Sequence, residues 1–261
     1  MSIAVYLLSR PSFEKAELLR FLADTELNWK QSQGAKPAEN LVEVAGRVCY
    51  MSFGDKQSPK SNVEYIENLV KQGHESVLEH ANWTFLVTGV SRAFSHQLVR
   101  HRAGVAFSQL SQQYHEETEA TFVEPAHIRD VPDARRIWQH AMQTARESYG
   151  QILKLLKKKN IGRMPGMSEK EVRRAILSAA RTVLPNATAT TIVFTANARA
   201  LRHFLEVRGA IIGDEEMRWT CRALLEQVKT EAAALFADFA VDTLPDGSPV
   251  VRKRLLDELV Q

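Results

Sequence analysis

The sequence contains very little cysteine. Cys49 and Cys221 are its two cysteines, and neither belongs to a CxxC motif or to a cluster of cysteine and histidine. This scarcity argues against a disulfide framework and a structural zinc site, so a reducing cytoplasm is the expected location. Neither thiol has a neighbouring base in the sequence that would activate it, and a cysteine nucleophile is therefore not expected.

Long hydrophobic runs are also missing. The first residues, MSIAVYLLSRPSFEKAELL, include a short apolar stretch but neither the basic n-region nor the small-residue cleavage site of a secretory signal. No stretch approaches the roughly twenty apolar residues that span a membrane. A soluble protein without a membrane partner is expected.

The common nucleotide-binding and hydrolase motifs are absent, because the chain has no GxGxxG, no P-loop and no GxSxG. The segment HESVLEH (74–80) lacks the histidine pair of the zinc motif HExxH, and its two histidines lie about 240° apart on an α-helix. No metal site is expected. Ser76 and Glu79, three residues apart, can still share a face and offer hydrogen bonds to a ligand.

The remaining composition is that of an ordinary globular protein, with 44% hydrophobic and 25% charged residues. The formal net charge of +3 suits an anionic ligand and does not require nucleic acid. The hydrophobic pattern predicts one α+β domain over 1–261, mostly helical with a small antiparallel sheet. Strands are expected at 2–8, 83–90 and 190–195, and helices at 41–52, 62–72, 91–102, 133–160, 169–185, 196–209 and 214–239.

Basic and amide side chains gather in HQLVRHRAGVAFSQLSQQY (96–114). Ser91 is the expected N-cap of the helix that leads into this segment. On that helix Phe94, Leu98 and His101 form one stripe, flanked by Gln97, Arg100 and Arg102. A satisfied core histidine between surface arginines is one interpretation. The serine- and glutamine-rich continuation favours the other, an anion site, because guanidinium groups match the geometry of phosphate.

The helix over 197–208 carries polar groups on opposite faces. One stripe contains Asn197, Leu201, Phe204, Leu205 and Arg208, and the other side contains Arg199, Arg202, His203 and Glu206. An arginine at the end of an apolar stripe is costly unless it meets an anion or a carboxylate. Arg208 is therefore a candidate ligand-binding residue, with an ion pair inside the protein as the alternative.

A helical nucleic-acid-binding module is an alternative from another class. It would use Arg100, Arg102, Arg199, Arg202 and the lysine run that follows Leu156. These basic residues are scattered among acids, and the lysine run is more simply a solvated end of a helix. A nucleic-acid partner is therefore not expected.

Several segments follow one another in the order found in a known family. RHRAGVAFSQLSQQY contains an RHR triplet followed by Ser111, where the family has an S-x-R-Y type segment. Further matching segments are AGRVCYMSF (45–53), HESVLEHANWTFLVTGVSR (74–92), RTVLPNATATTIVFTANARALRHFLEVR (181–208) and LFADF (235–239). With these segments the chain resembles the flavin-dependent thymidylate synthases, the ThyX family, over most of its length.

The resemblance implies a ThyX-like fold and a homotetramer in which FAD binds between subunits. It also implies NADPH as the reductant of the flavin and methylenetetrahydrofolate as the one-carbon donor. The implied reaction is C5-methylation of a uracil nucleotide, dUMP to dTMP, with release of tetrahydrofolate. A site shared between subunits would explain the two polar faces of the helix over 197–208.

The resemblance also assigns residues by position. Flavin contacts fall on Ser76, Glu79, Arg100, His101, Arg102, Asn197, Arg199 and His203. Nucleotide contacts fall on Gln97, Arg100, Gln109, Ser111, Gln113, Arg181 and Arg208, and a folate contact falls on His74. Arg208 and Ser111 are the candidate catalytic residues, with Arg208 expected to polarise the uracil ring.

Two residues depart from the family pattern. Gln113 stands where the family usually has an arginine that helps to hold the nucleotide phosphate, and a neutral amide cannot replace that charge. Ile212 stands where the family often has a histidine that contacts the flavin. Both departures leave a second substrate open, namely UMP, methylated alone or together with dUMP in the biosynthesis of a modified nucleoside.

Overall fold

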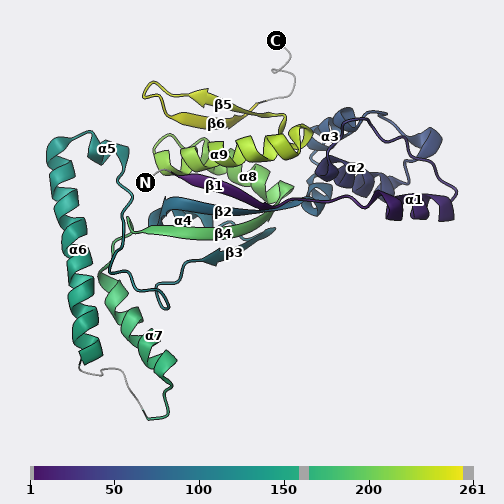
Figure 1. Ribbon diagram of the computed structural model, residues 1–261. Coiled ribbons are helices and arrows are strands. Elements are labelled where there is room, and N and C mark those ends of the chain that lie inside the picture. Colours follow the sequence, from purple (N-terminus) through teal and green to yellow (C-terminus); the bar gives the residue numbers. More distant parts are fainter. Residues whose placement is uncertain (1–2, 159–164, 255–261) are drawn as a thin grey trace. The chain divides into compact units, whose positions relative to one another are not determined.

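The computed structural model describes residues 3–158 and 165–254 (Figure 1). The chain divides into two compact units, each assembled from separate segments. The first unit contains residues 87–100 and 108–192, and the second contains residues 4–86, 101–107 and those from 193 onward. About half of the chain is helical and the strands are few, which confirms the expected α+β class.

Four strands form a sheet in the order β1-β2-β4-β3. They are β1 (Ala4–Ser9), β2 (Asn82–Ser91), β3 (Val105–Gln109) and β4 (Ala189–Asn197). Buried and half-exposed residues alternate along β2 and β4, as expected when one face of a sheet is covered. The expected strands at 83–90 and 190–195 are confirmed, whereas β3 was not expected, because its five residues mix serine and glutamine with only short apolar side chains and one phenylalanine.

In the second unit, helices α8 (Ala198–Gly209) and α9 (Glu215–Glu231) contact each other and the hairpin of β5 (Phe239–Thr243) and β6 (Pro249–Lys253). The hairpin is antiparallel, with Val241 opposite Val251. The hairpin lies beside α9 in Figure 1. The helix expected over 214–239 is shorter than predicted. Helix α9 stops at Glu231, and the 3-10 turn η4 (Ala233–Phe236) and the hairpin follow it.

One ion pair is buried beneath α8. The Arg202 guanidinium donates to both carboxylate oxygens of Asp238, at 2.7 and 2.6 Å, and to the carbonyl of Leu235 at 2.6 Å. Both side chains are nearly inaccessible, at 2% and 4% exposure. The expectation that Arg202 lies on the polar side of α8 is therefore wrong: its planar fork of donors lets a charged residue occupy the buried face.

The same unit contains helices α1 (Lys15–Asp24), α2 (Pro37–Tyr50) and α3 (Asn62–Lys71). The helix expected over 41–52 begins four residues earlier, because Pro37 fits the first turn of α2. Inside α2, Arg47 donates to Glu43 at 2.7 Å, and Glu43 also accepts from Asn62 of α3 at 2.7 Å. This buried network joins α2 to α3.

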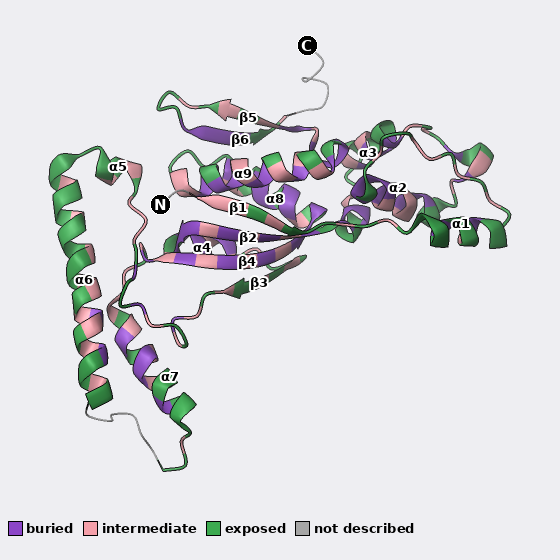
Figure 2. Ribbon diagram, in the orientation of Figure 1, coloured by how far each residue is buried: buried purple, intermediate pink, exposed green. Residues whose placement is uncertain are grey.

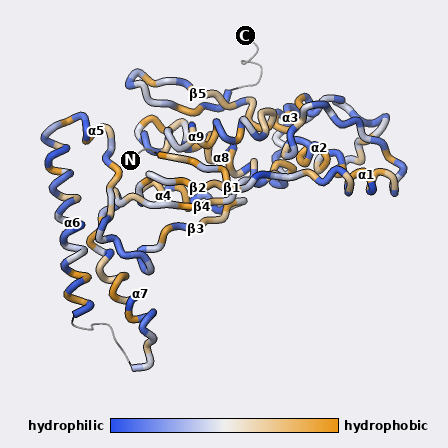
Figure 3. The backbone as a smooth tube through the Cα atoms, viewed as in Figure 1, coloured by the Kyte–Doolittle hydropathy of each residue, from blue (hydrophilic) through white to orange (hydrophobic). Residues whose placement is uncertain are grey.

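In the first unit, α6 (Pro132–Lys158) and α7 (Glu169–Ala180) pack together through a small core of Tyr149, Leu153, Val172, Ile176, Leu177 and Ala180. Most of α6 is exposed away from this core (Figure 2), and its hydropathy alternates along its length (Figure 3). Ser168 and Glu171 form a capping box at the start of α7. The helix expected over 169–185 ends at Ala180 and continues as the 3-10 turn η3 (Arg181–Val183).

The helix before the RHR triplet is shorter than expected. Helix α4 (Arg92–Leu98) begins after Ser91, whose Oγ accepts from the backbone N–H of Phe94 at 3.0 Å, and this confirms the cap. It ends at Leu98, so Arg100, His101 and Arg102 lie outside it. The stripe that placed His101 in line with Phe94 and Leu98 is therefore wrong, and the triplet belongs to the turn that follows.

Replacing Asp238 by alanine should lower the free energy of unfolding by about 3–5 kcal/mol, because it leaves a buried guanidinium without its carboxylate. The matched control is Asp242→Ala, which removes a half-exposed aspartate of β5 paired with Arg252 and Arg254 and should cost less than about 1 kcal/mol. Urea denaturation of both variants measures the difference, and equal losses would show that the buried pair does not hold α8.

Candidate active site

His101 of the RHR triplet lies among residues of α8. Its Nε2 accepts a hydrogen bond from Nε of Arg208 at 2.9 Å. Its ring lies edge-on to Phe204, with the centroids 5.2 Å apart, and 5.6 Å from the ring of His203. The Arg208 bond requires Nε2 to be unprotonated, so the imidazole is neutral with its hydrogen on Nδ1.

Arg208 thus meets an imidazole at the end of the apolar stripe of α8. The side chain is half-buried. A bond to a neutral imidazole does not neutralise the charge of the guanidinium. The ion pair of Arg202, six residues earlier on α8, does neutralise its charge. Such an arginine is suited to bind an anion or a developing negative charge.

Asn197 joins the start of α8 to the turn after the RHR triplet. Its side chain caps α8 by accepting from the backbone N–H of Ala200 at 2.8 Å, and its own N–H donates to the carbonyl of Gly104 at 3.1 Å. Gly104 has a φ of +70°, and a Cβ there would lie 2.4 Å from the Asn197 amide nitrogen. Glycine is therefore required at 104 both by the backbone conformation and by this close approach.

Arg199 pairs with carboxylates of the 3-10 turn η2 (Glu75–His80). Its Nη1 donates to Glu79 at 2.6 Å, and its Nε lies 3.7 Å from Glu75. The hydrogen bond with Glu79 raises the pKa of Arg199 above its usual value. Two residues that the resemblance assigned to the flavin, Glu79 and Arg199, are thus brought together by the structure.

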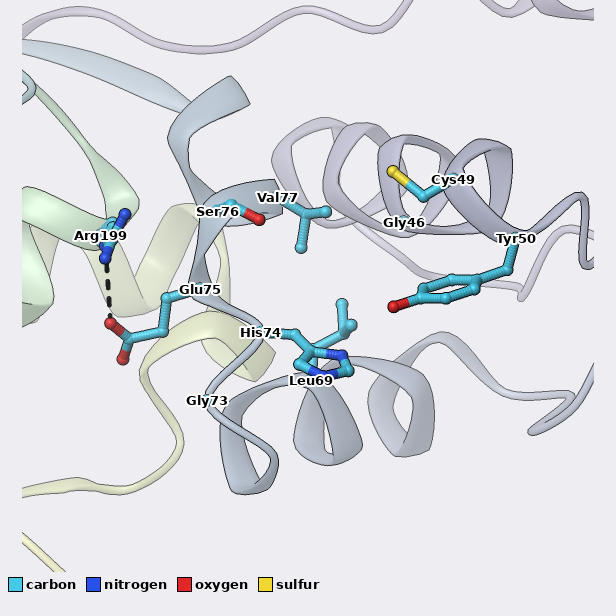
Figure 4. Close-up of a pocket in the computed structure, with 10 residues that line it drawn as sticks. All are labelled: Gly46, Cys49, Tyr50, Leu69, Gly73, His74, Glu75, Ser76, Val77 and Arg199. Atoms are coloured by element: carbon cyan, nitrogen blue, oxygen red, sulfur yellow. Dashed lines mark ion pairs between the residues drawn. The ribbon is translucent and has the colours of Figure 1, made fainter.

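His74 and Ser76 line a pocket of about 290 Å³ beside this ion pair (Figure 4). The other lining residues are Gly46, Cys49, Tyr50, Leu69, Gly73, Glu75, Val77 and Arg199. His74, in the turn after α3, and the hydroxyl of Tyr50, at the end of α2, face the same space (Figure 4). Sequence reasoning missed Tyr50, which the matching segment AGRVCYMSF contains.

In the first unit, Gln109 connects β3 with α4 and β4. Its Nε2 donates to Ser95 Oγ at 2.8 Å and to Thr190 Oγ1 at 3.1 Å. These bonds fix the orientation of the amide and commit its two N–H groups. The carbonyl oxygen Oε1 is then the end of the side chain suited to a ligand, which it can contact only as an acceptor.

Ser111 begins the turn that follows β3. Its Oγ accepts from the N–H of Gln113 at 3.3 Å, and its carbonyl accepts from the N–H groups of Tyr114 and His115. The Gln113 Oε1 accepts from Nε of Arg174, on α7, at 3.2 Å. Arg174 was not singled out from the sequence, although it stands seven residues before Arg181 and therefore on the same side of the helix.

Two further arginines lie close to one another in this unit. Arg92 donates to the carbonyl of Leu110 at 3.4 Å, and burial lowers the pKa of Arg92 from its usual value. The positive charge of Arg181 lowers it further, whereas the carboxylate of Glu117 opposes both effects. Burial in turn raises the pKa of Glu117. Sequence reasoning identified Arg181 but missed Arg92.

Most of the expected flavin contacts belong to the second unit, and most of the expected substrate contacts belong to the first. Of the flavin set, Ser76, Glu79, His101, Arg102, Asn197, Arg199 and His203 belong to the second unit and Arg100 to the first. Of the substrate set, Gln97, Arg100, Gln109, Ser111, Gln113 and Arg181 belong to the first unit, and His74 and Arg208 belong to the second. Arg100, Arg102 and His203 are exposed, and Gln97 is half-buried.

The cysteines and the metal-binding residue types do not form a site. Cys49 is exposed and Cys221 is buried, and both are free thiols. Burial raises the pKa of the Cys221 thiol far above its usual range, which keeps it protonated and unreactive. Within the described ranges no group of histidine, cysteine, aspartate or glutamate is placed to hold a metal ion, and no helix is long and apolar enough to cross a membrane.

Three of the basic residues of the nucleic-acid alternative are paired with acids. Arg202 is buried against Asp238, Arg199 contacts Glu79, and Lys157 donates to Glu116 at 2.8 Å. The end of the lysine run, from residue 159, lies outside the described residues. Among the described residues, arginines lie beside His101 and beside the turn that Ser111 begins, where they could meet a small anionic ligand.

The candidate sites of this α+β chain carry arginine, histidine and amide groups, which are suited to an anionic small molecule. A family model described as thymidylate synthase complementing protein matches residues 33–233. The chain therefore belongs to this family, which confirms the resemblance to the flavin-dependent thymidylate synthases.

Curated relatives agree with the family match. The chain is 41% identical to the flavin-dependent thymidylate synthase of Mycobacterium tuberculosis (strain H37Rv). The 240 aligned residues cover 91% of this chain and 93% of the relative. It is 40% identical, with the same coverage, to the protein of that name from Mycobacterium avium (strain 104). The protein of that name from Corynebacterium efficiens is 42% identical over 216 residues, which cover 82% of this chain and 84% of the relative.

Gly104→Ala should destabilise the protein more than Gly247→Ala does. Both glycines have a positive φ, +70° and +79°, but a Cβ at 247 meets nothing within 4 Å, whereas one at 104 displaces the Asn197 cap. We expect Gly104→Ala to lower the free energy of unfolding by about 1–2 kcal/mol more than the control does, measured by urea denaturation. Equal effects would exclude the Asn197 contact as the reason for glycine at 104.

Proposed function

We propose that this chain catalyses the flavin-dependent C5-methylation of dUMP to dTMP, with methylenetetrahydrofolate as the one-carbon donor and NADPH as the reductant. The family match and the names of its relatives support this activity. The observation that carries it is the contact between His101 and Arg208, because it brings His101 against the end of α8 and orients the Arg208 guanidinium without neutralising it.

The residues assigned to the flavin are suited to hold FAD. Arg199, Asn197, His101, His203 and Ser76 offer cationic and hydrogen-bonding groups for a diphosphate and for ring heteroatoms. The Asn197 side chain caps α8 at the N–H of Ala200, and the Asn197 backbone N–H donates to Gly104, so the start of α8, from which Arg199 projects, is held in place. When bound, FAD supplies the hydride that converts the transferred one-carbon unit into a methyl group.

The first unit offers the groups that a uracil nucleotide requires. Gln109, with both amide N–H groups engaged, presents a carbonyl acceptor suited to a donor such as uracil N3–H or a sugar hydroxyl. Ser111 offers a hydroxyl beside it, and Arg181 offers a cation for the phosphate. Gln97, Arg100 and Gln113 complete the proposed set of nucleotide contacts.

Arg208 is the proposed catalytic residue. Carbon C5 of uracil acts as a nucleophile when negative charge is shared with the oxygen on C4, and a guanidinium at that oxygen stabilises the charge. The His101 bond holds the Arg208 side chain in one orientation before substrate binds, which lowers the cost of ordering it. Ser111 is the second proposed catalytic residue, placed to orient the nucleotide.

The pocket beside η2 is the proposed folate contact. His74 and Tyr50 offer polar groups there, and Leu69 and Val77 offer apolar surface, a combination suited to an aromatic ring system with polar edges. We further infer one catalytic domain over 1–261, a homotetramer with sites shared between subunits, and a cytoplasmic location. The two free cysteines are consistent with that location.

Release of tritium from C5-labelled dUMP tests the activity. With NADPH and methylenetetrahydrofolate, the purified yellow protein should release label from dUMP, because methylation replaces the hydrogen on C5. C5-labelled UMP, run in parallel, should release at least tenfold less. Equal or greater release from UMP would make UMP the substrate of the same reaction. A colourless protein that takes up no FAD would exclude a flavin-dependent reaction.

Arg208→Ala should abolish nucleotide-dependent oxidation of the reduced flavin while the protein stays folded. We expect a loss of at least about a hundredfold, in the range found when a donor to a developing charge is removed. The control is Arg222→Ala, which removes a half-exposed arginine of α9 paired with Glu226. Anaerobic stopped-flow absorbance measures the rate, and wild-type turnover in the variant would make Arg208 a structural residue.

A further inference from the structure

Gln113 has a charged partner on α7. Its Oε1 accepts from the Arg174 Nε at 3.2 Å, at a turn whose first residue is Ser111. Gln113 is half-buried and Arg174 is exposed. The bond engages the single N–H of Nε, and the guanidinium carries four further N–H donors on its two Nη atoms.

Helix α7 presents a basic edge to this turn. Lys170 lies over the ring of Tyr114, with 5.8 Å between its Nζ and the ring centroid, and Arg174 follows one turn later. Arg181 stands seven residues further on, about 20° away around the helix axis and about 10 Å along it. Lys170 and Arg174 therefore contact residues 114 and 113, and Arg181 follows on the same side of the helix.

The hydrogen bonds of the neighbouring acids go to other groups, although the charge of Arg174 adds to the Ser168 hydrogen bonds in lowering the pKa of Glu171. Glu116 accepts from Lys157 at 2.8 Å and from Arg173 at 3.4 Å, so two other cations occupy it. Glu171 accepts from the backbone N–H and the hydroxyl of Ser168 at the start of the helix. Arg174 donates to a neutral amide oxygen, and such a bond orients a guanidinium without neutralising it.

We propose that Arg174 binds the phosphate of the nucleotide and that Gln113 positions it. This inference rests on the proposed function. Gln113 stands at the position where the resemblance predicts an arginine. Its hydrogen bond with Arg174 brings a guanidinium from α7 to the same turn. Arg174 of α7 thus supplies the positive charge that position 113 lacks, and the Gln113 amide orients its guanidinium. Arg181 provides the second cation of the same phosphate site.

Binding of dUMP and of deoxyuridine to the flavin-loaded full-length protein tests this proposal. The variants are Arg174→Gln, Gln113→Arg, and the double variant with both changes. The matched control is Arg173→Gln, which removes the adjacent exposed arginine that pairs with Glu116. Equilibrium dialysis gives the Kd of each nucleotide, and tritium release gives KM and kcat for dUMP.

Arg174→Gln should weaken dUMP binding at least about tenfold, as expected for one charge-assisted contact with phosphate. Its Kd for deoxyuridine, which has no phosphate, should stay within about twofold of the wild-type value, and so should kcat at saturating dUMP. The double variant should recover dUMP affinity to within about threefold of wild type, because the arginine then stands at position 113. Arg173→Gln should behave as wild type.

Two results would overturn the role of Arg174. One is unchanged dUMP affinity in Arg174→Gln, and the other is equal weakening of dUMP and deoxyuridine, which indicates a structural effect without recognition of phosphate. Failure of the proposed function looks different, because the wild-type protein itself would then release no tritium from either dUMP or UMP. The dialysis measurement does not depend on turnover and separates the two cases.

Discussion

The buried pair of Arg202 and Asp238 is the constraint on which the second unit depends. It fixes the rotation of α8, because a guanidinium at 2% exposure has to keep its carboxylate. With Arg202 turned inward, Arg199 and His203 are exposed and Arg208 lies against His101. A single helix can therefore carry its apolar stripe, its structural arginine and its candidate ligand-binding residues without conflict.

The candidate sites share one chemical principle, in which cations are oriented by neutral partners. Arg208 donates to an imidazole nitrogen, and Arg174 donates to an amide oxygen. Elsewhere arginines are neutralised by carboxylates, as Arg47 is by Glu43 and Arg199 is by Glu79. An arginine with a neutral partner keeps its charge for a ligand, and this applies to Arg208 and Arg174. Arg199 would bind the flavin as part of its ion pair with Glu79.

The sequence predicted most long helices, the strands β2 and β4 and the stripe-end position of Arg208, because each follows from periodicity or from a motif. It could not predict that α4 ends at Leu98, since residues 99–102 continue the helical pattern. The burial of Arg202 and the partner of Gln113 depend on Asp238 and Arg174, which are distant in the chain. Such pairings arise from tertiary packing, and no local pattern contains them.

The central claim is that the reducing electrons for the new methyl group come from NADPH through the flavin. Conversion of a methylene group to a methyl group needs two electrons, and if the folate supplied them it would leave as dihydrofolate. The most direct measurement is therefore the identity of the folate product, separated anaerobically beside dTMP after complete turnover. We expect tetrahydrofolate in an amount equal to dTMP and to the NADPH consumed. Dihydrofolate in that amount would contradict a flavin-dependent reaction.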